Sequence, residues 1–277
     1  DDPFTKKVGL WMYGVPIFYA GLTTTVSINW QRRLADMRKP EWRAYLVHKA
    51  ELAIDAGKPV FLHQRDGHDA FVETMQHLAN AGIAYFGGGH DLAEAHRPLW
   101  IDKYGLKIAV LGYNEFKPRA FQAGANWPGI AWSEDDLVIA DIRAAKAAGA
   151  DLVIPFMHWG WEKETQPSER QKTFARRMID EGAALVVGSH PHVTQGAEIY
   201  KGRPIVYSLG NFVFDGFDYP EAQRGWLLRL KLDKSGVIFW ETLAAQIDDA
   251  GTPWPVSGAF TPCGRGGEDL VVECQSP

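Results

Sequence analysis

Two amphipathic segments alternate with short apolar segments in the second half of the chain. Apolar residues recur at helical spacing over 133–149 and 167–182, and each segment has a serine near its start and a glycine at its end. The runs ADLVIPFMH and AALVVGSH follow these segments and are almost wholly apolar before their final histidine. Such runs are typical of buried strands. The alternation therefore predicts helix–strand units of an α/β fold.

Neighbouring segments extend this pattern in both directions. Residues 69–89 predict a helix, then a strand, then a glycine turn, and 105–114 predict another buried strand. Residues 203–214 predict a third strand, and 226–243 predict a hairpin that turns at 233–236. An antiparallel portion therefore follows the alternating portion, within one α/β fold class.

The first sixty residues give weaker patterns. Residues 8–28 carry no charge and are long enough to span a bilayer. Pro16, three glycines and three consecutive threonines favour a strand, a turn and a second strand instead. Residues 37–57 have a helical pattern after Pro40. The chain does not begin with methionine, so we expect a membrane anchor only if an upstream segment supplies it.

Composition narrows the classes of partner. Of the 277 residues, 46% are hydrophobic, which is enough for a core. The net charge of −5 and the absence of a long basic run argue against nucleic acid or an anionic membrane surface as the main partner. Cys263 and Cys274 lack the CxxC spacing of a structural zinc site. A disulfide and two free thiols remain equally open for them.

Three histidines lie just past the ends of consecutive predicted strands. His158 ends one strand, and His190 and His192 follow the next. The carboxyl edge of an α/β sheet is where ligands bind, and residues two apart in an extended segment point the same way. Pro191 stiffens that pair. A single histidine would usually only form hydrogen bonds within its loop, whereas three so placed favour a site for Zn, Mn, Fe or Ni.

Polar residues after the strand at 105–114 lie at the same predicted edge. They are substrate-side candidates, namely Asn114, Glu115, Lys117 and Arg119.

Acid–base candidates come from two other places. His63, Asp66 or His68 has a suitable side chain for general acid or base catalysis. Glu162, four residues after His158, is placed to orient a ligand imidazole, although a solvated carboxylate beside Lys163 explains it as well.

Several long motifs resemble one known family. They are MHWGWEKETQPSERQ, EGAALVVGSHPHVTQGAE, RPIVYSLGNFVFD and GGGHDLAEAHRP. Together they resemble the CapA family of poly-γ-glutamate capsule biosynthesis proteins over about 69–243. That family is similar to the calcineurin-like metallophosphoesterases, which implies a two-sheet sandwich flanked by helices. The resemblance further implies that His158, His190 and His192 bind metal, and that Asn211 lines the cavity.

The N-terminal part departs from the family pattern. A strand ending in Gly-Asp is expected there, yet KKVGLWMYGVP has no aspartate. In FLHQRDG, His63 and Asp66 match a family Asn-Asn-His-x-x-Asp motif whose second asparagine is replaced by Leu62. We therefore expect one domain over 1–250, divergent over 1–65, and a tail over 251–277. Loss of a bridging carboxylate favours one ion over two, so the expected cofactor is one or two divalent ions of Zn, Mn or Fe.

Three functions fit these expectations. The first is a metal-dependent hydrolase of an amide or phosphoester, acting on a γ-glutamyl polymer or a peptide. The second is a non-catalytic accessory that binds an anionic polymer in capsule synthesis or export. The third is a metal-dependent peptide epimerase, which needs acid–base groups on both faces of a carbon and no water nucleophile. The expected partner is a peptide or an anionic polymer.

Overall fold

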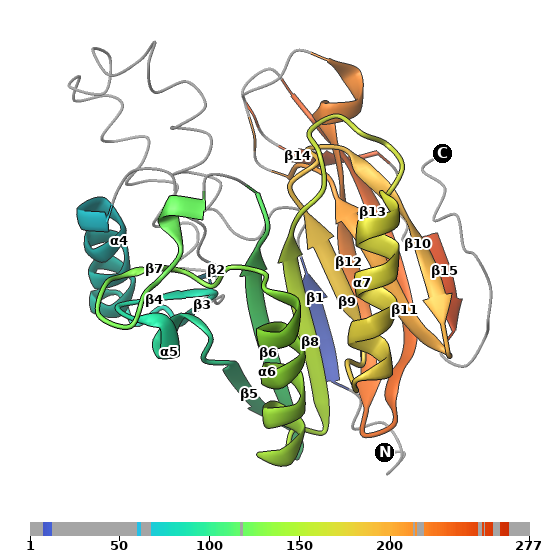
Figure 1. Ribbon diagram of the computed structural model, residues 1–277. Coiled ribbons are helices and arrows are strands. Elements are labelled where there is room, and N and C mark those ends of the chain that lie inside the picture. The colour runs from blue at the N-terminus through green and yellow to red at the C-terminus, as the bar shows by residue number, and fades with distance from the viewer. Residues whose placement is uncertain are drawn as a thin grey trace.

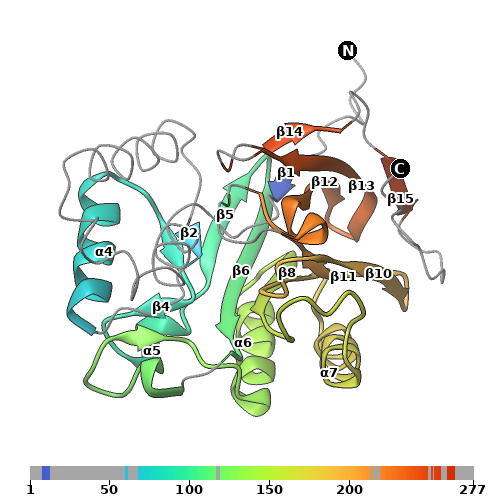
Figure 2. The ribbon, with the colours of Figure 1, turned by 90° about the horizontal axis from the view of Figure 1, so that it is seen from above.

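Two β-sheets face one another, and helices α6 (Asp135–Ala147) and α7 (Glu169–Asp180) cover the outer face of the larger sheet (Figure 1). Seen from above, these elements form three layers, in the order helices, larger sheet, smaller sheet (Figure 2). This computed structural model describes residues 8–12, 60–61, 68–116, 119–212, 214, 219–248, 251, 253–256 and 261–265. The two-sheet arrangement with flanking helices confirms the predicted α/β fold class.

The larger sheet has six strands. Their order is β10 (Thr194–Tyr200), β11 (Arg203–Leu209), β9 (Val186–Ser189), β8 (Leu152–His158), β6 (Leu106–Asn114) and β5 (Leu99–Lys103). The four central strands β11, β9, β8 and β6 are parallel, whereas β10 and β5 run antiparallel to their neighbours. The carboxyl ends of the four parallel strands therefore meet at one edge of the sheet.

The smaller sheet has five strands. They are β1 (Val8–Met12), β12 (Arg224–Asp233), β13 (Gly236–Ile247), β14 (Pro253–Pro255) and β15 (Thr261–Arg265). β12 and β13 form the predicted hairpin, and β1 pairs with the other side of β12. β14 and β15 come from the segment after residue 250 and both pair with β13. The proposed domain boundary at 250 stays a prediction.

A smaller layer packs beside β5 and β6. It contains α4 (His68–Asn80), α5 (Leu92–Ala95), and the paired strands β2 (Val60–Phe61) with β3 (Tyr85–Phe86) and β4 (Gly88–Gly89) with β7 (Gly129–Ile130). Two short 3-10 turns, Arg119–Phe121 and Pro220–Gln223, complete the described elements. Phe71, Met75 and Leu78 of α4 pack with Ile83 and Ile130 in a separate apolar cluster.

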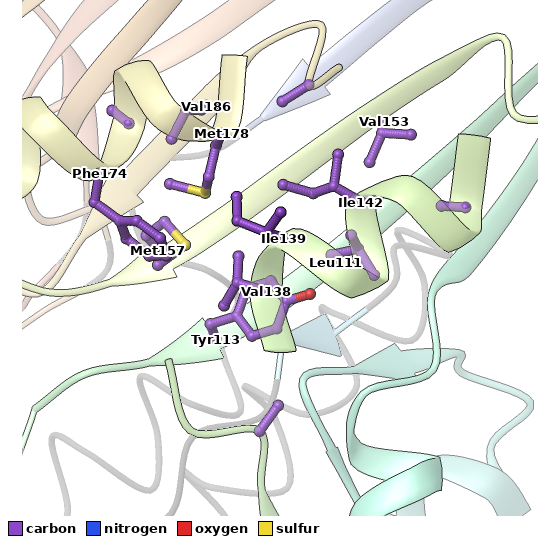
Figure 3. Close-up of a cluster of buried hydrophobic side chains, with 14 of the residues drawn as sticks. Leu111, Tyr113, Val138, Ile139, Ile142, Val153, Met157, Phe174, Met178 and Val186 are labelled. Carbon is purple, nitrogen blue, oxygen red and sulfur yellow. The ribbon is translucent and has the colours of Figure 1, made fainter. Parts of the chain in front are cut away.

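Strict alternation along the central strands produces two cores. On β6, Ile108 and Val110 face the smaller sheet, whereas Leu111 and Tyr113 face the helices. The same alternation along β8 explains why its run is apolar throughout: both faces are covered. Figure 3 shows the helix-side cluster, in which Ile142 of α6 and Met178 of α7 meet the sheet.

The two helices begin differently. Ser168 and Gln171 form a capping box at the start of α7, in which each side chain bonds the other residue's backbone N–H. The α6 helix has no side-chain cap at Glu134, but Asp135 and Asp136 in its first turn favour the positive end of the helix dipole. Both helices end just before a glycine with positive φ, Gly149 or Gly182, as expected.

Most predicted elements are confirmed, and several strands were missed. The helix and strand predictions within 69–89, 105–114, 133–158, 167–189 and 203–243 correspond to described elements. The missed elements are the short helix α5 and the strands β2, β4, β5, β7, β10, β14 and β15. Val8–Met12 is a strand, as favoured, but 13–28, the predicted helix after Pro40 and Cys274 lie outside the described residues. Among the described helices, none is long and apolar enough to cross a membrane.

Candidate metal centre

The three predicted histidine ligands meet at the carboxyl edge of the larger sheet. His158 is the last residue of β8 and pairs in register with Ser189, the last residue of β9, so His190 follows directly beside it. The ring centroids of His158 and His190 are 4.5 Å apart, and those of His190 and His192 are 6.0 Å apart. All three side chains are buried. The sequence pattern therefore located a real cluster.

Glu162 joins this cluster from the loop between β8 and α7. Its carboxylate and a ring nitrogen of each of His190 and His192 lie within 4.8 Å of one another, which is a group that can hold a metal ion. Two imidazoles and a carboxylate are a ligand set used by Zn, Mn and Fe sites. The sequence placed Glu162 near the site only as an orienting or acid–base group, whereas the geometry puts its carboxylate among the atoms that could bind an ion.

Asn211 fixes which nitrogen His192 offers. Its side-chain N–H groups donate to the carbonyl oxygens of His192 (3.2 Å) and Ala222 (2.7 Å). The amide oxygen is therefore the atom that lies 2.8 Å from Nδ1 of His192, so Nδ1 must carry the hydrogen. That leaves the Nε2 lone pair for a metal, the usual arrangement for an oriented histidine ligand. The predicted cavity residue Asn211 thus contacts one of the predicted metal ligands directly.

The backbone is strained at these same positions. His190 (φ 102°), His192 (φ 61°) and Lys163 (φ 71°) all adopt positive φ, which side chains with a Cβ rarely do. Such conformations cost about 1–3 kcal/mol each and persist where the surroundings enforce them. Elsewhere in the described chain, the non-glycine positive φ values are those of Tyr104 and Lys201, each followed by glycine in a turn. The concentration of strain at the cluster is typical of a functional site.

One glycine allows the strands beneath the site to pack closely. A Cβ on Gly188 would lie 2.0 Å from the carbonyl oxygen of Tyr207 and 2.4 Å from the indole nitrogen of Trp159. That indole N–H donates to the same carbonyl oxygen at 2.9 Å. Gly188 is thus required because the strands approach closely there. It leaves room for Trp159, the residue after His158, to lie across β9.

Aromatic side chains surround the histidines. The ring of Phe116 is 3.9 Å from that of His190, and the ring of Phe214 is 4.8 Å from that of His192. Tyr219 lies under the ammonium of Lys163, at 4.8 Å from its ring centroid. Burial, and then the charges of Glu162 and Glu221, raise the pKa of Tyr219 to about 12. Sequence reasoning missed these residues, although Phe116 and Phe214 follow Asn114 and Asn211 by only two and three positions.

The predicted substrate-side residues make contacts within the protein. The Asn114 amide bonds the backbone N–H and carbonyl of Phe116, and the Glu115 backbone N–H donates to the His158 carbonyl at 2.8 Å. Arg119 pairs with Glu134 at 2.6 Å. Asn114 and Glu115 thus flank the cluster, whereas Arg119 lies further along the same loop. Substrate binding by these three stays a prediction, and so does that by Lys117, which lies outside the described residues.

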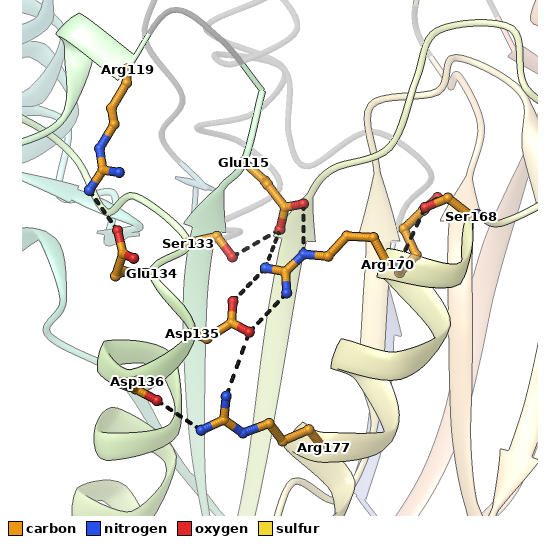
Figure 4. A network of polar contacts seen from close by, with 10 residues as sticks. Glu115, Arg119, Ser133, Glu134, Asp135, Asp136, Ser168, Arg170 and Arg177 are labelled. Carbon is orange, nitrogen blue, oxygen red and sulfur yellow. Dashed lines mark hydrogen bonds and ion pairs between the residues drawn. The ribbon is translucent and has the colours of Figure 1, made fainter.

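A charged network lies beside the cluster (Figure 4). The Arg170 guanidinium bonds the carboxylates of Glu115 and Asp135, and Glu115 also accepts from the Ser133 hydroxyl at 3.3 Å. Hydrogen bonds donated to Asp135, and then to Glu115, raise the pKa of Arg170. Arg177 extends the network to Asp136. These contacts join the loop after β6 to the first turn of α6 and to α7.

The predicted acid–base residues are not all placed. His63 and Asp66 lie outside the described residues, as does the side chain of His68. Their roles stay predictions, and the geometry above is that of the C-terminal half of the expected site.

Comparisons with known proteins match these motifs. A family model described as Bacterial capsule synthesis protein PGA_cap matches residues 63–216. PGA biosynthesis protein CapA of Bacillus subtilis (strain 168) is 36% identical over 191 residues, covering 69% of this chain and 50% of that protein. Capsule biosynthesis protein CapA of Bacillus anthracis is 34% identical over 195 residues, covering 68% of this chain and 46% of that protein. The chain thus spans about half the length of these relatives.

Similar solved structures are more distant. Sulfate thiohydrolase SoxB of Thermus thermophilus, solved in complex with glycerol, is 17% identical with a TM-score of 0.42, covering 69% of this chain and 31% of that chain. A score of this size carries no argument about activity, which has to come from the residues at the sheet edge.

Proposed function

This chain belongs to the family of bacterial capsule synthesis proteins, and from that membership we propose that it is a metal-dependent hydrolase of an anionic capsule polymer. The bond cleaved is an amide or a phosphoester, and the γ-linked amide of poly-γ-glutamate is the favoured substrate because the Bacillus subtilis relative is named for PGA biosynthesis. The observation that carries the proposal is the group formed by Glu162, His190 and His192, with His158 beside it.

We expect this group of side chains to bind one metal ion. Within the described residues, one group of three metal-ligating side chains is found, and it contains a single carboxylate. A divalent ion there would polarise a carbonyl or phosphoryl oxygen and make a water easier to deprotonate. Zn, Mn and Fe all suit imidazole with carboxylate.

The chain's own groups would prepare this chemistry. Asn211 holds His192 in the tautomer whose Nε2 faces away from it. Phe116 and Phe214 pack on the histidine rings, and their apolar faces reduce the local polarity, which strengthens electrostatic interactions. With a pKa of about 12, Tyr219 keeps its hydroxyl hydrogen at neutral pH and remains a donor near Glu162. His63 and Asp66 remain the proposed general acid and base.

One exposed cation beside Glu162 supports an anionic substrate. Lys163 directly follows Glu162, is exposed, and has its ammonium above the Tyr219 ring. An extended polymer with carboxylates would meet this positive charge as it passed the metal ligands. Trp161, which precedes Glu162 in the chain, is also exposed and offers an apolar face.

Metal content tests the proposal first. Protein purified without chelator should contain about one equivalent of a transition metal by plasma mass spectrometry, and the His190→Ala/His192→Ala variant should contain almost none. The matched control is His77→Ala/His90→Ala, which removes two exposed imidazoles paired with Glu73 and Glu94 and should keep the metal. Absence of metal from the wild type would overturn the catalytic proposal.

Cleavage tests the reaction. The metal-loaded protein should shorten poly-γ-glutamate and release new amino termini, and the double histidine variant should not. Metal binding without cleavage would favour a polymer-binding accessory. Exchange of solvent deuterium into the α-carbons of a peptide, without chain shortening, would identify an epimerase instead.

A further inference from the structure

Two buried glutamines join the loop that carries Glu162 to the segment that carries His190 and His192. We propose that Gln195 and Gln171 are positioning residues of the metal centre, which hold Glu162 at the distance that the two histidines require. This inference rests on the proposed metal site, but it concerns residues that make none of the ligand contacts. Its physical basis is a chain of hydrogen bonds in which each amide has one permitted orientation.

Gln195 is saturated by its contacts. It lies in β10, three residues after His192, and is 1% exposed. Its side-chain nitrogen donates to the backbone carbonyls of Glu164 (2.9 Å) and Gln166 (3.2 Å), and its oxygen accepts from the Gln171 amide (2.9 Å). Both N–H groups are thus used on the loop between β8 and α7.

Gln171 determines the orientation of both side-chain amides. Its side-chain oxygen accepts from the backbone N–H (3.0 Å) and the hydroxyl (3.1 Å) of Ser168, as part of the capping box. The nitrogen must therefore point to Gln195, whose oxygen must point back. A Cβ on Gly160 would lie 2.9 Å from the Gln171 oxygen, so the loop backbone also packs directly against this amide.

The attachment points bracket the site. The Lys163 N–H, directly after Glu162, donates at 2.8 Å to the carbonyl of Pro191, which lies between the two histidines. Gln195, which follows His192 in the chain, donates to the carbonyls of Glu164 and Gln166. The loop is thus bound to the histidine segment before and after His192. Two attachments of this kind can maintain the positive φ of Lys163 and His192, which would otherwise relax.

The amide is the side chain that suits this role. A carboxylate at 195 would have no N–H for the two carbonyls and would add a negative charge, whereas an apolar side chain would leave the carbonyls and the Gln171 amide unpaired. Fully satisfied buried polar networks of this kind rigidify a structure. Gln195→Met therefore removes the attachment while preserving chain length and apolar volume.

Metal affinity measures the positioning. We expect Gln195→Met to bind Zn²⁺ about 10–100-fold more weakly than the wild type in a competition titration with a chelating dye. The control Ile199→Ala lies on the same strand and creates a cavity between the sheets, so it should lower the unfolding temperature but leave the Zn²⁺ affinity unchanged. Equal weakening in both variants would overturn the inference.

A double-mutant cycle shows whether the effect passes through Glu162. If Gln195 acts by holding Glu162, then Glu162→Gln/Gln195→Met should bind Zn²⁺ no more weakly than Glu162→Gln alone. Independent losses that multiply would overturn the inference while leaving the metal site intact. A wild type that binds no Zn²⁺ would instead overturn both proposals.

Two further measurements avoid reliance on one variant. Gln171→Glu keeps the acceptor for Ser168 but loses the donor to Gln195, so it should weaken Zn²⁺ binding without unfolding α7. In metal-free protein, hydrogen exchange of the Lys163 amide should become faster in Gln195→Met and stay slow in Ile199→Ala. Unchanged exchange in Gln195→Met would contradict the attachment itself.

Discussion

Arg170 and Gln171 are adjacent in the first turn of α7, yet they bind their surroundings in opposite ways. The Arg170 side chain is 43% exposed and pairs with the carboxylates of Glu115 and Asp135 (Figure 4). Gln171 is 1% exposed and forms neutral amide bonds to Gln195 and Ser168. The first residue joins α7 to α6 and to the loop after β6, whereas the second joins it to Gln195 of β10.

The difference shows that a charged contact need not stabilise the fold more than a neutral one. Exposed ion pairs contribute about 0–1 kcal/mol, because water and salt screen them and long side chains lose entropy on ordering. A buried neutral hydrogen bond contributes about as much while intact, but removing one partner leaves a desolvated group that costs about 1–3 kcal/mol. Breaking the buried hydrogen bonds of Gln171 should therefore lower the free energy of unfolding more than breaking the ion pairs of Arg170.

The largest effect should come from Gln171→Leu. This change leaves the Gln195 oxygen without its donor and removes the capping box, so we expect the free energy of unfolding to fall by about 2–4 kcal/mol. Urea denaturation measures it, and the loss should be similar at low and high salt. Gln76→Leu on α4, where the amide is exposed, is the matched control and should change stability little. A loss below about 1 kcal/mol would contradict the comparison.

A smaller effect is expected for Arg170→Met. The methionine keeps an apolar stem against Phe174, over whose ring the guanidinium lies at 4.4 Å, but it removes the ion pairs. We expect a loss of about 1 kcal/mol at low ionic strength, falling toward zero in 1 M NaCl, where the Debye length is about 3 Å. Denaturation at both salt concentrations tests it. A loss that does not depend on salt would show that packing dominates.

The smallest effect should be that of Arg177→Met. Its closest partner, Asp136, has a side chain that is 91% exposed, and its contact with Asp135 is longer, at 3.6 Å. We expect less than about 0.5 kcal/mol in the same titration. A loss as large as that of Arg170→Met would mean that the charged side chains of α6 and α7 stabilise the two helices as one unit. These side chains are Asp135, Asp136, Arg170 and Arg177.

Sequence patterns identified what depends on periodicity and chain neighbours. His158, His190 and His192 could be located because parallel strands bring their ends to one edge. Ser168 and Gln171 have the spacing of a capping box, so that half of the glutamine pair was within reach of sequence reasoning. The family resemblance is confirmed by the match over residues 63–216.

Other features depend on contacts that no local pattern encodes. Gln195 meets a loop some thirty residues earlier, and Glu162 reaches the histidines from a loop in which Gly160 and Lys163 take positive φ. Strand β10 was missed because Gln195, Gly196 and Glu198 interrupt its apolar residues, although the turn at Lys201 and Gly202 could have indicated a hairpin.

The pairing of β1 with β12 has a consequence for how the chain folds during synthesis. Val8 pairs with Leu232 and Met12 with Leu228, so the first strand of the smaller sheet is translated long before its partner. At 5–20 residues per second, the wait is roughly 10–45 s. Through that interval the apolar segment VGLWM is on the nascent chain without the partner it has in the folded protein. If β1 failed to dock afterwards, the edge of β12 that it covers would be open to pairing with another polypeptide, so closure of this sheet is a step at which the chain is exposed to aggregation.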